Sequence, residues 1–265
     1  MIYADTHIHL QDYSPADVKN VVTNANKNNV CEFVNASSHP TDWQKVLDIV
    51  AEFKNVIPAI GVHPWYVSEA PADWAEQLED LLHQNSKLWL GECGIDRLKN
   101  PDTNKQLAIL QTQIALAKKY QRPLIMHAVK ADKILHPLLT ELPKKTIFHS
   151  FTGSVEWGKE LQRHGFYLGL NFSVLHKKNY TELLQRLNLH QLLLETDGPY
   201  QSGQKDKQSL PQNHRSWLKK SLLFSICLSV NFQKLLLLIG KLLRENKKCK
   251  QRPNLYACKL PFSDV

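Results

Sequence analysis

Two histidines stand one residue apart near the start of the chain, in the run Asp5-Thr6-His7-Ile8-His9. On a β-strand, side chains at positions i and i+2 point to the same face, so His7 and His9 can present two imidazoles to one ion. Neutral imidazole is the commonest protein ligand for zinc and related metals. Because two nitrogens do not complete a site, we expect carboxylates and further histidines from later segments to join them.

Short apolar runs rich in β-branched residues alternate along the chain with longer segments of helical period, a pattern typical of βα units around a parallel sheet. The expected strands are Ile2–His7, Glu32–Ala36, Val56–Val62, Leu88–Glu92, Pro123–His127, Thr146–His149, Phe166–Leu170 and Leu192–Glu195. The expected helices are Ala16–Asn28, Thr41–Phe53, Ala72–Gln84, Thr103–Tyr120, Ala131–Glu141, Ser154–His164 and Asn179–Leu187. Eight strands separated by helices predict an α/β fold of the (β/α)8 TIM-like barrel type.

In such a barrel the chemistry lies at the carboxyl ends of the strands. Most of the ionisable residues that could do chemistry end or follow an expected strand, so they should converge on one rim. They are His7, His9, His63, Glu92, Asp96, His127, His149 and Asp197. A structural role is plausible for any one of them, but not for so many at one end of the barrel.

Six short motifs contain these residues, in this order along the chain: DTHIH at 5–9, GVHPW at 61–65, GECGID at 91–96, MHAVKA at 126–131, FHSFTG at 148–153 and ETDGPY at 195–200. Together they resemble the ordered motifs of the TatD-type metal-dependent deoxyribonucleases, which belong to the amidohydrolase barrel superfamily. The resemblance runs through roughly residues 1–203. It implies a hydrolase that cleaves DNA, expected to be an exonuclease.

The resemblance also implies two divalent cations, whose identity (magnesium, manganese, zinc or cobalt) the sequence leaves open. The implied ligands are His7, His9 and Asp197 for one ion, His127 and His149 for the other, and Glu92 bridging both. Two close ions can clamp a phosphate and lower the pKa of a shared water. We expect Asp197 and Glu92 to be the catalytic residues, with Asp197 accepting a proton from that water.

Two further residues are candidates for substrate binding. His63 is expected to contact a phosphate or to support a ligand, although a structural role is open, and Arg97 could grip a phosphate or form an exposed ion pair. Asp5 is expected to orient its neighbours by hydrogen bonds. Many family members have His-x-Arg at the fifth strand, whereas Lys130 is the nearest cation after His127 here. Because lysine cannot bind a phosphate through two parallel hydrogen bonds as arginine does, this departure could change the substrate preference.

Length and composition favour one large soluble domain. The 265 residues are 43% hydrophobic and 22% charged, which is ordinary for a globular protein. The five cysteines form no CxxC pair and fit reduced thiols, with Cys93 expected to be buried behind the barrel. No signal-peptide pattern is visible at the first residues, so we expect a cytoplasmic protein. We expect no membrane association, and no obligate protein partner is evident.

The charge divides the chain into two parts. Residues 1–205 carry 21 Lys+Arg and 22 Asp+Glu, whereas residues 206–265 carry 12 and 3. We therefore expect a hydrolase barrel at 1–205 and a divergent basic segment at 206–265, in which the family pattern is lost after about Gln212. A buried helix, a shifted reading frame or a divergent replacement of the last barrel helix are the open interpretations. From about residue 213 onward we expect poor packing on the barrel.

The sequence thus predicts a metal-dependent phosphodiesterase whose substrate is DNA and possibly RNA. Two alternatives stay open. The same metal ligands could activate water against an amide, ester or lactone. The altered C-terminal segment could also leave the barrel inactive.

Overall fold

The structure is a computed structural model and describes residues 3–99, 102–171, 173–174, 178, 180–201 and 210–211. Within them, eight parallel strands form one sheet in chain order. The strands are β1 (Tyr3–Ile8), β2 (Val30–Ala36), β3 (Val56–Ile60), β4 (Trp89–Asp96), β5 (Leu124–Val129), β6 (Thr146–Phe148), β7 (Tyr167–Leu170) and β8 (Leu192–Leu194). The predicted (β/α)8 barrel is confirmed.

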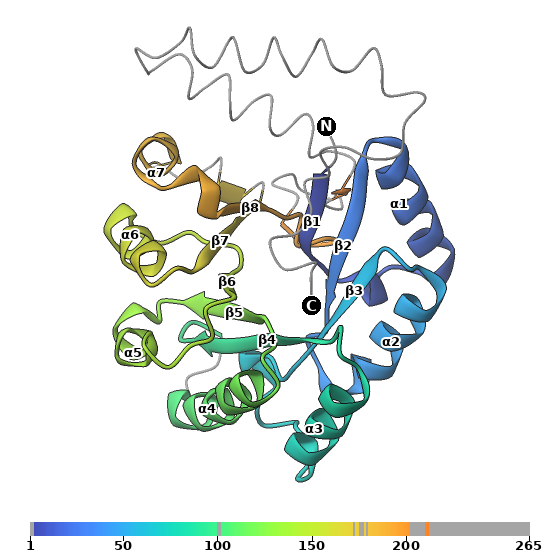
Figure 1. Cartoon of the computed structure of the whole chain (residues 1–265), viewed down its shortest axis with the longest axis horizontal. Helices are drawn as coiled ribbons and strands as arrows, with labels where there is room; N and C mark the ends of the chain where they lie inside the picture. The colour runs from blue at the N-terminus through green and yellow to red at the C-terminus, as the bar shows by residue number, and fades with distance from the viewer. Residues whose placement is uncertain are drawn as a thin grey trace, which may run out of the picture.

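Helices ring the outside of the sheet (Figure 1). They are α1 (Pro15–Lys27), α2 (Trp43–Glu52), α3 (Trp74–Gln84), α4 (Thr103–Lys119), α5 (Asp132–Leu135), α6 (Val155–Arg163) and α7 (Tyr180–Arg186). Among the described 3-10 turns, η1 (Leu10–Asp12), η2 (Pro40–Asp42) and η3 (Pro64–Tyr66) follow strands. The turn η4 (His136–Leu138) follows α5, and η6 (Leu189–Gln191) precedes β8. Ser14 and Ser154 cap α1 and α6 through their side chains, as expected for helix N-termini.

The sheet closes into a barrel where the chain just after β8 meets β1. Ile8 forms a bridge with Gly198, and the backbone N–H of His9 donates to the Gly198 carbonyl at 2.8 Å. The N–H of Asp197 donates to the His7 carbonyl at 2.9 Å. Closure therefore places Asp197 beside the two histidines, although Asp197 lies far from them in the sequence.

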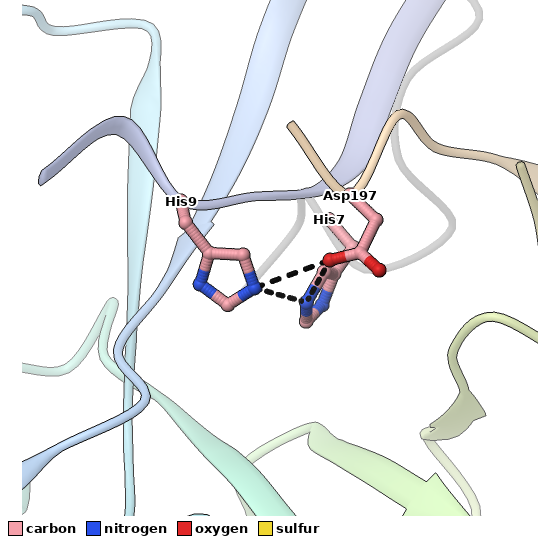
Figure 2. Close-up of side chains that lie close together, drawn as sticks. All are labelled: His7, His9 and Asp197. Atoms are coloured by element: carbon pink, nitrogen blue, oxygen red, sulfur yellow. Dashed lines mark hydrogen bonds and ion pairs between the residues drawn. The ribbon is translucent and has the colours of Figure 1, made fainter. Parts of the chain in front are cut away.

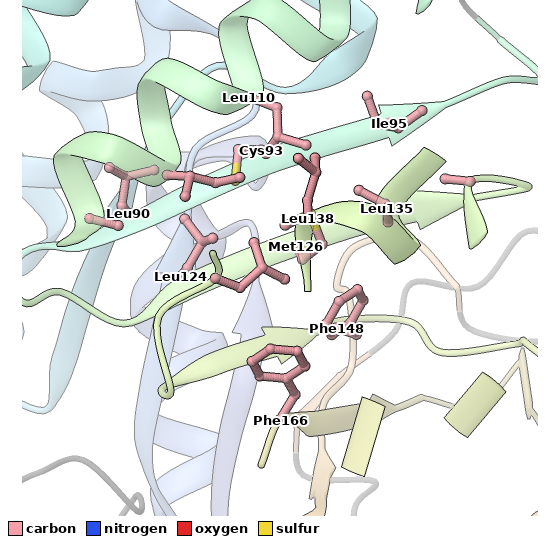
Figure 3. Close-up of a cluster of buried hydrophobic side chains, with 14 of the residues drawn as sticks. Leu90, Cys93, Ile95, Leu110, Leu124, Met126, Leu135, Leu138, Phe148 and Phe166 are labelled. Atoms are coloured by element: carbon pink, nitrogen blue, oxygen red, sulfur yellow. The ribbon is translucent and has the colours of Figure 1, made fainter. Parts of the chain in front are cut away.

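Apolar side chains fill two layers on either side of the strands. The larger layer lies between the strands and the helices, and Figure 3 shows Leu90, Cys93, Leu110 and Met126 within it. The second layer draws its buried members from strands alone and fills the bottom of the barrel: Val34, Ala36, Ala59, Trp89, Ile125 and Ile147. The expected burial of Cys93 is confirmed, since it has no exposed surface.

Register irregularities interrupt β1 between Asp5 and Ile8, and β4 between Leu90 and Cys93. A bulge inserts one residue and reverses which side of the sheet the following side chains face. On β4, Trp89 belongs to the inner layer and Leu90 to the outer one, whereas after the irregularity Cys93 is again outer. Glu92 consequently points into the barrel.

The largest difference from the predicted elements lies after β5. We expected a helix over Ala131–Glu141, but α5 ends at Leu135 and η4 follows. Pro137 explains this, because proline has no N–H to continue an α-helix. Most of the predicted basic segment 206–265, with its expected poor packing, lies outside the described residues. No described helix has the length and apolar character needed to cross a membrane.

Candidate metal centre

Three of the predicted ligands meet where β1 and the chain after β8 come together. His9 Nε2 lies 3.2 Å from Asp197 Oδ1 and 3.2 Å from His7 Nε2, and His7 Nε2 lies 3.7 Å from the same carboxylate oxygen (Figure 2). All three side chains are buried. These donor atoms face one common point, as the ligands of a single cation do.

The carboxylate of Glu92 divides its two oxygens between two groups of imidazoles. Oε2 lies 3.2 Å from His7 Nε2 and 3.4 Å from His9 Nε2. Oε1 lies 2.7 Å from His149 Nε2 and 3.1 Å from His127 Nδ1. A carboxylate in this position can contribute one oxygen to each of two neighbouring cations.

Hydrogen bonds to one ring nitrogen fix which nitrogen faces the centre. The Nδ1–H of His9 donates to the Ala36 carbonyl at 2.8 Å, which leaves Nε2 as a ligand atom. The Nε2–H of His127 donates to Asp96 Oδ2 at 3.1 Å, which leaves Nδ1. His7 and His149 stack with ring centroids 4.1 Å apart, and their Nδ1 atoms are buried without a hydrogen-bond partner in the described part of the chain.

Electrostatics at the centre follow from burial and from the mixture of acids and imidazoles. Burial would raise the pKa of Glu92, but His149, His63 and His7 hold it well below its ordinary value. Burial would lower the pKa of His9, but Asp197 and Glu92 raise it to about 9. Burial and the neighbouring His149 lower the pKa of His7 to about 4. The centre therefore keeps its carboxylates ionised, which suits divalent cations.

The donor set itself fits such cations. It combines imidazole nitrogens with carboxylate oxygens and contains no thiolate, a combination used for zinc, manganese or cobalt, and less often for magnesium. Ring nitrogens and carboxylate oxygens lie within 4.8 Å of one another in three groups: His7, His9 and Asp197; His7, Glu92 and His149; and His63, Glu92 and His127.

A cleft of about 470 Å³ opens above the centre. Its described lining residues come from the loops after most of the strands and include His63, Trp65, Tyr66 and Tyr200. Neither lysine nor arginine is among them. Among the described lining residues, the positive charge for an anionic group would therefore come from the metal centre.

A family model described as TatD related DNase matches residues 4–222. The chain belongs to the TatD family. The matched range extends beyond residue 203, where the resemblance was expected to end.

Two relatives illustrate the similarity. The "Deoxyribonuclease Tat-D" of Schizosaccharomyces pombe is 29% identical over 202 residues, which cover 70% of this chain and 65% of the yeast protein, so the match spans just under two thirds of that relative. The "Uncharacterized metal-dependent hydrolase YjjV" of Escherichia coli is 26% identical over 206 residues, covering 74% of this chain and 79% of the relative. The crystal structure of YjjV superposes with a TM-score of 0.77 at 24% identity, covering 83% of this chain and 88% of that one. This structural likeness supports the barrel fold.

The structure thus brings together the six residues that the TatD-like motifs suggested as ligands, and places the other two candidates differently. His63 lies in the cluster, with Nε2 3.3 Å from Glu92 Oε1. Its Nδ1 accepts the Trp65 backbone N–H at 3.1 Å, so the ring proton is on Nε2 and His63 is a donor toward the centre. Arg97 is exposed and does not line the cleft.

From the sequence we expected Asp96 on the rim of the barrel, but we did not find its role. The Asp96 carboxylate accepts the indole N–H of Trp65 at 2.6 Å in addition to the His127 proton. Its other oxygen accepts the backbone N–H groups of Leu98 and Lys99. Burial would raise its pKa, but these donors hold it far below the ordinary value. The available signal in the sequence was the position of Asp96 as the last residue of the GECGID motif.

Glu195 was also missed, although it opens the ETDGPY motif. Its carboxylate is buried below His149, accepts the Ser150 backbone N–H, and lies 3.9 Å from His149 Nδ1. Burial and the nearby Asp197 raise its pKa well above the ordinary value. A Cβ on Gly169 would come within 2.0 Å of Glu195 Oε2, so only glycine leaves room for this carboxylate. Asp5, as expected, orients a neighbour: it accepts the Thr196 hydroxyl at 2.6 Å.

Proposed function

We propose that this protein is a two-metal phosphodiesterase that cleaves DNA from an end, as an exonuclease. The observation that supports this most strongly is the division of the two Glu92 oxygens between two imidazole groups. A bridging carboxylate holds two cations close enough to contact one phosphate. The proposed ligands are His7, His9 and Asp197 on one side, His127 and His149 on the other, and Glu92 between them.

Divalent ions bound there would polarise a phosphoryl oxygen and lower the pKa of a coordinated water. The residues of the chain supply the rest of the mechanism. Asp197 turns one oxygen toward His7 and His9 and the other away from them (Figure 2), and we assign this second oxygen as acceptor of the proton from the attacking water. His63 donates its Nε2 proton to a phosphate oxygen, and Asp96 keeps His127 aimed at the centre.

DNA as the substrate rests on the family, whose model is described as a DNase, and on the yeast relative named a deoxyribonuclease. RNA is retained as a second substrate, because both polymers present the same phosphodiester to the centre. We propose a cytoplasmic protein, since the described cysteines Cys31 and Cys93 are free thiols, as in a reducing compartment.

A second candidate function is hydrolysis of an amide, ester or lactone. The lack of lysine and arginine among the described cleft residues favours it, because an uncharged substrate needs no cation beyond the metal centre. The same activated water can attack a carbonyl carbon.

One experiment separates the two candidates. The protein is stripped with a chelator, reloaded separately with magnesium, manganese, zinc or cobalt, and incubated with single-stranded DNA labelled at either end. We expect metal-dependent shortening from one end, no cleavage by the stripped protein, and weak activity against a panel of esters and lactones. Metal-dependent turnover of a carbonyl substrate with intact DNA would instead establish the second candidate.

A further inference from the structure

Tyr200 presents its ring on the wall of the cleft, beside the metal centre. The side chain is 53% exposed, one of three large apolar residues so exposed in the described part of the chain. Its ring centroid lies 5.7 Å from that of His9, with the two planes at 69°. Tyr200 therefore borders the place where a substrate phosphate would lie.

The ring is fixed at both ends. Its backbone follows Asp197 in the turn after β8, and its hydroxyl donates to Asp12 Oδ2 in η1 at 3.0 Å. A side chain held in this way loses little conformational entropy when a ligand stacks on it. Tyr200 is a preorganised flat surface rather than a loose surface tyrosine.

The rings of Trp65 and Tyr66, which also line the cleft, are in contact with other side chains. Lys99 Nζ sits 3.3 Å from the centroid of the Trp65 ring, and the indole N–H is bonded to Asp96. Tyr66 packs edge to face with His39, centroids 4.9 Å apart. Tyr200 is the aromatic residue of the described wall with the most open ring.

The chemistry of the cleft distinguishes two parts of a ligand. The proposed cations would attract the phosphate, and no described lining residue is a lysine or arginine that would compete for it. The group attached to that phosphate meets an uncharged aromatic ring instead. A nucleobase has the planar π-face that stacks on such a ring, and every base can do so.

We propose that Tyr200 is the stacking platform for the nucleobase of a nucleotide next to the scissile phosphate. This inference rests on the proposed function and adds to it the group by which the substrate is recognised. It makes the enzyme prefer nucleotide ends that carry a base over otherwise identical ends that lack one.

The test compares oligonucleotides that differ by a single missing base. An abasic tetrahydrofuran residue is placed at each of the three terminal positions of either end, and kcat and KM are measured with metal-loaded protein. We expect one position at which loss of the base lowers kcat/KM by about 5- to 100-fold, mainly through KM. Equal cleavage of all these substrates would overturn the inference and leave the proposed function intact. If no DNA were cleaved at all, both the inference and the proposed function would be overturned.

Two variants assign the effect to the ring. Tyr200→Leu removes the π-face but keeps apolar bulk, so it should raise KM for the complete substrate and leave the abasic one nearly unchanged. Tyr200→Phe keeps the ring and should retain most of the discrimination, although it loses the bond to Asp12. The inference would be overturned if Tyr200→Leu lowered kcat/KM equally for the complete and the abasic substrate. It would also be overturned if Tyr200→Leu and Tyr200→Phe lowered kcat/KM to the same extent, because either result would show a structural role. Bound metal, measured in parallel, should match the unaltered protein.

Discussion

At the scale of single residues, the centre depends on which atom each side chain turns inward. His9 and His127 both carry a proton on the nitrogen that faces a backbone carbonyl or a carboxylate, so the opposite nitrogen is available. Asp197 turns one oxygen toward His7 and His9 and the other away from them. The resemblance of the motifs to the TatD family suggested the ligand residues, but the assignment of atoms required the three-dimensional neighbours.

Replacing Asp197 by asparagine separates binding from proton transfer. The amide oxygen can still face His7 and His9, but the side chain can no longer accept a proton from the attacking water. We expect DNA binding to survive while kcat falls by about two to four orders of magnitude, the usual share of general base catalysis. Gel-shift and single-turnover assays measure the two properties separately. Unchanged kcat across the pH range would rule out the assigned role.

Asp96→Asn tests the residue that orients His127. Both carboxylate oxygens of Asp96 accept two N–H groups each, and an amide offers only one oxygen, so two donors would face an NH2 group. We expect the affinity for the more weakly bound metal to fall by about 10- to 100-fold. Metal titration measures this, and Trp65 fluorescence should change with it.

The exposed change Asp48→Asn on α2 is the matched control for Asp96→Asn. It should leave metal affinity and fluorescence as they are. If Asp96→Asn binds metal like the control, His127 is oriented by its own strand, and the carboxylate has no positioning role.

At the scale of elements, the strands position the site through their irregularities. The existence and order of the strands were predictable from the apolar runs. The breaks in β1 and β4 were not, because a bulge adds a residue without changing composition. His9 likewise lies one residue beyond β1, although the spacing suggested that both histidines share a strand. Strands were therefore predictable, and their exact ends and registers were not.

Gly169→Ala on β7 tests how closely the Glu195 carboxylate packs against the backbone of that strand. The added methyl group would overlap the Glu195 carboxylate, so we expect the free energy of unfolding to fall by about 1–3 kcal/mol. Urea unfolding measures it. In a Glu195→Ala background the same substitution should cost much less, because the overlapping atoms are gone. Equal costs in both backgrounds would mean that the backbone, not Glu195, demands glycine.

At the scale of the whole molecule, a barrel brings together residues that lie far apart in the sequence. His7 and Asp197 become neighbours only because the segment after β8 pairs with β1. The motif order and the strand count made this convergence predictable from sequence. Contacts such as those of Asp96 and Glu195 were not predictable, because they depend on side-chain packing between strands that no spacing rule specifies.

The central claim is that Glu92 joins two cations into one centre, and the number of ions bound per chain tests it most directly. Elemental analysis of equilibrated protein should find about two ions in the unaltered chain, as a carboxylate-bridged pair requires. In Glu92→Ala we expect fewer than one, and the exposed control Glu52→Ala should keep the full complement. Two ions retained in Glu92→Ala would contradict the bridge and the mechanism built on it.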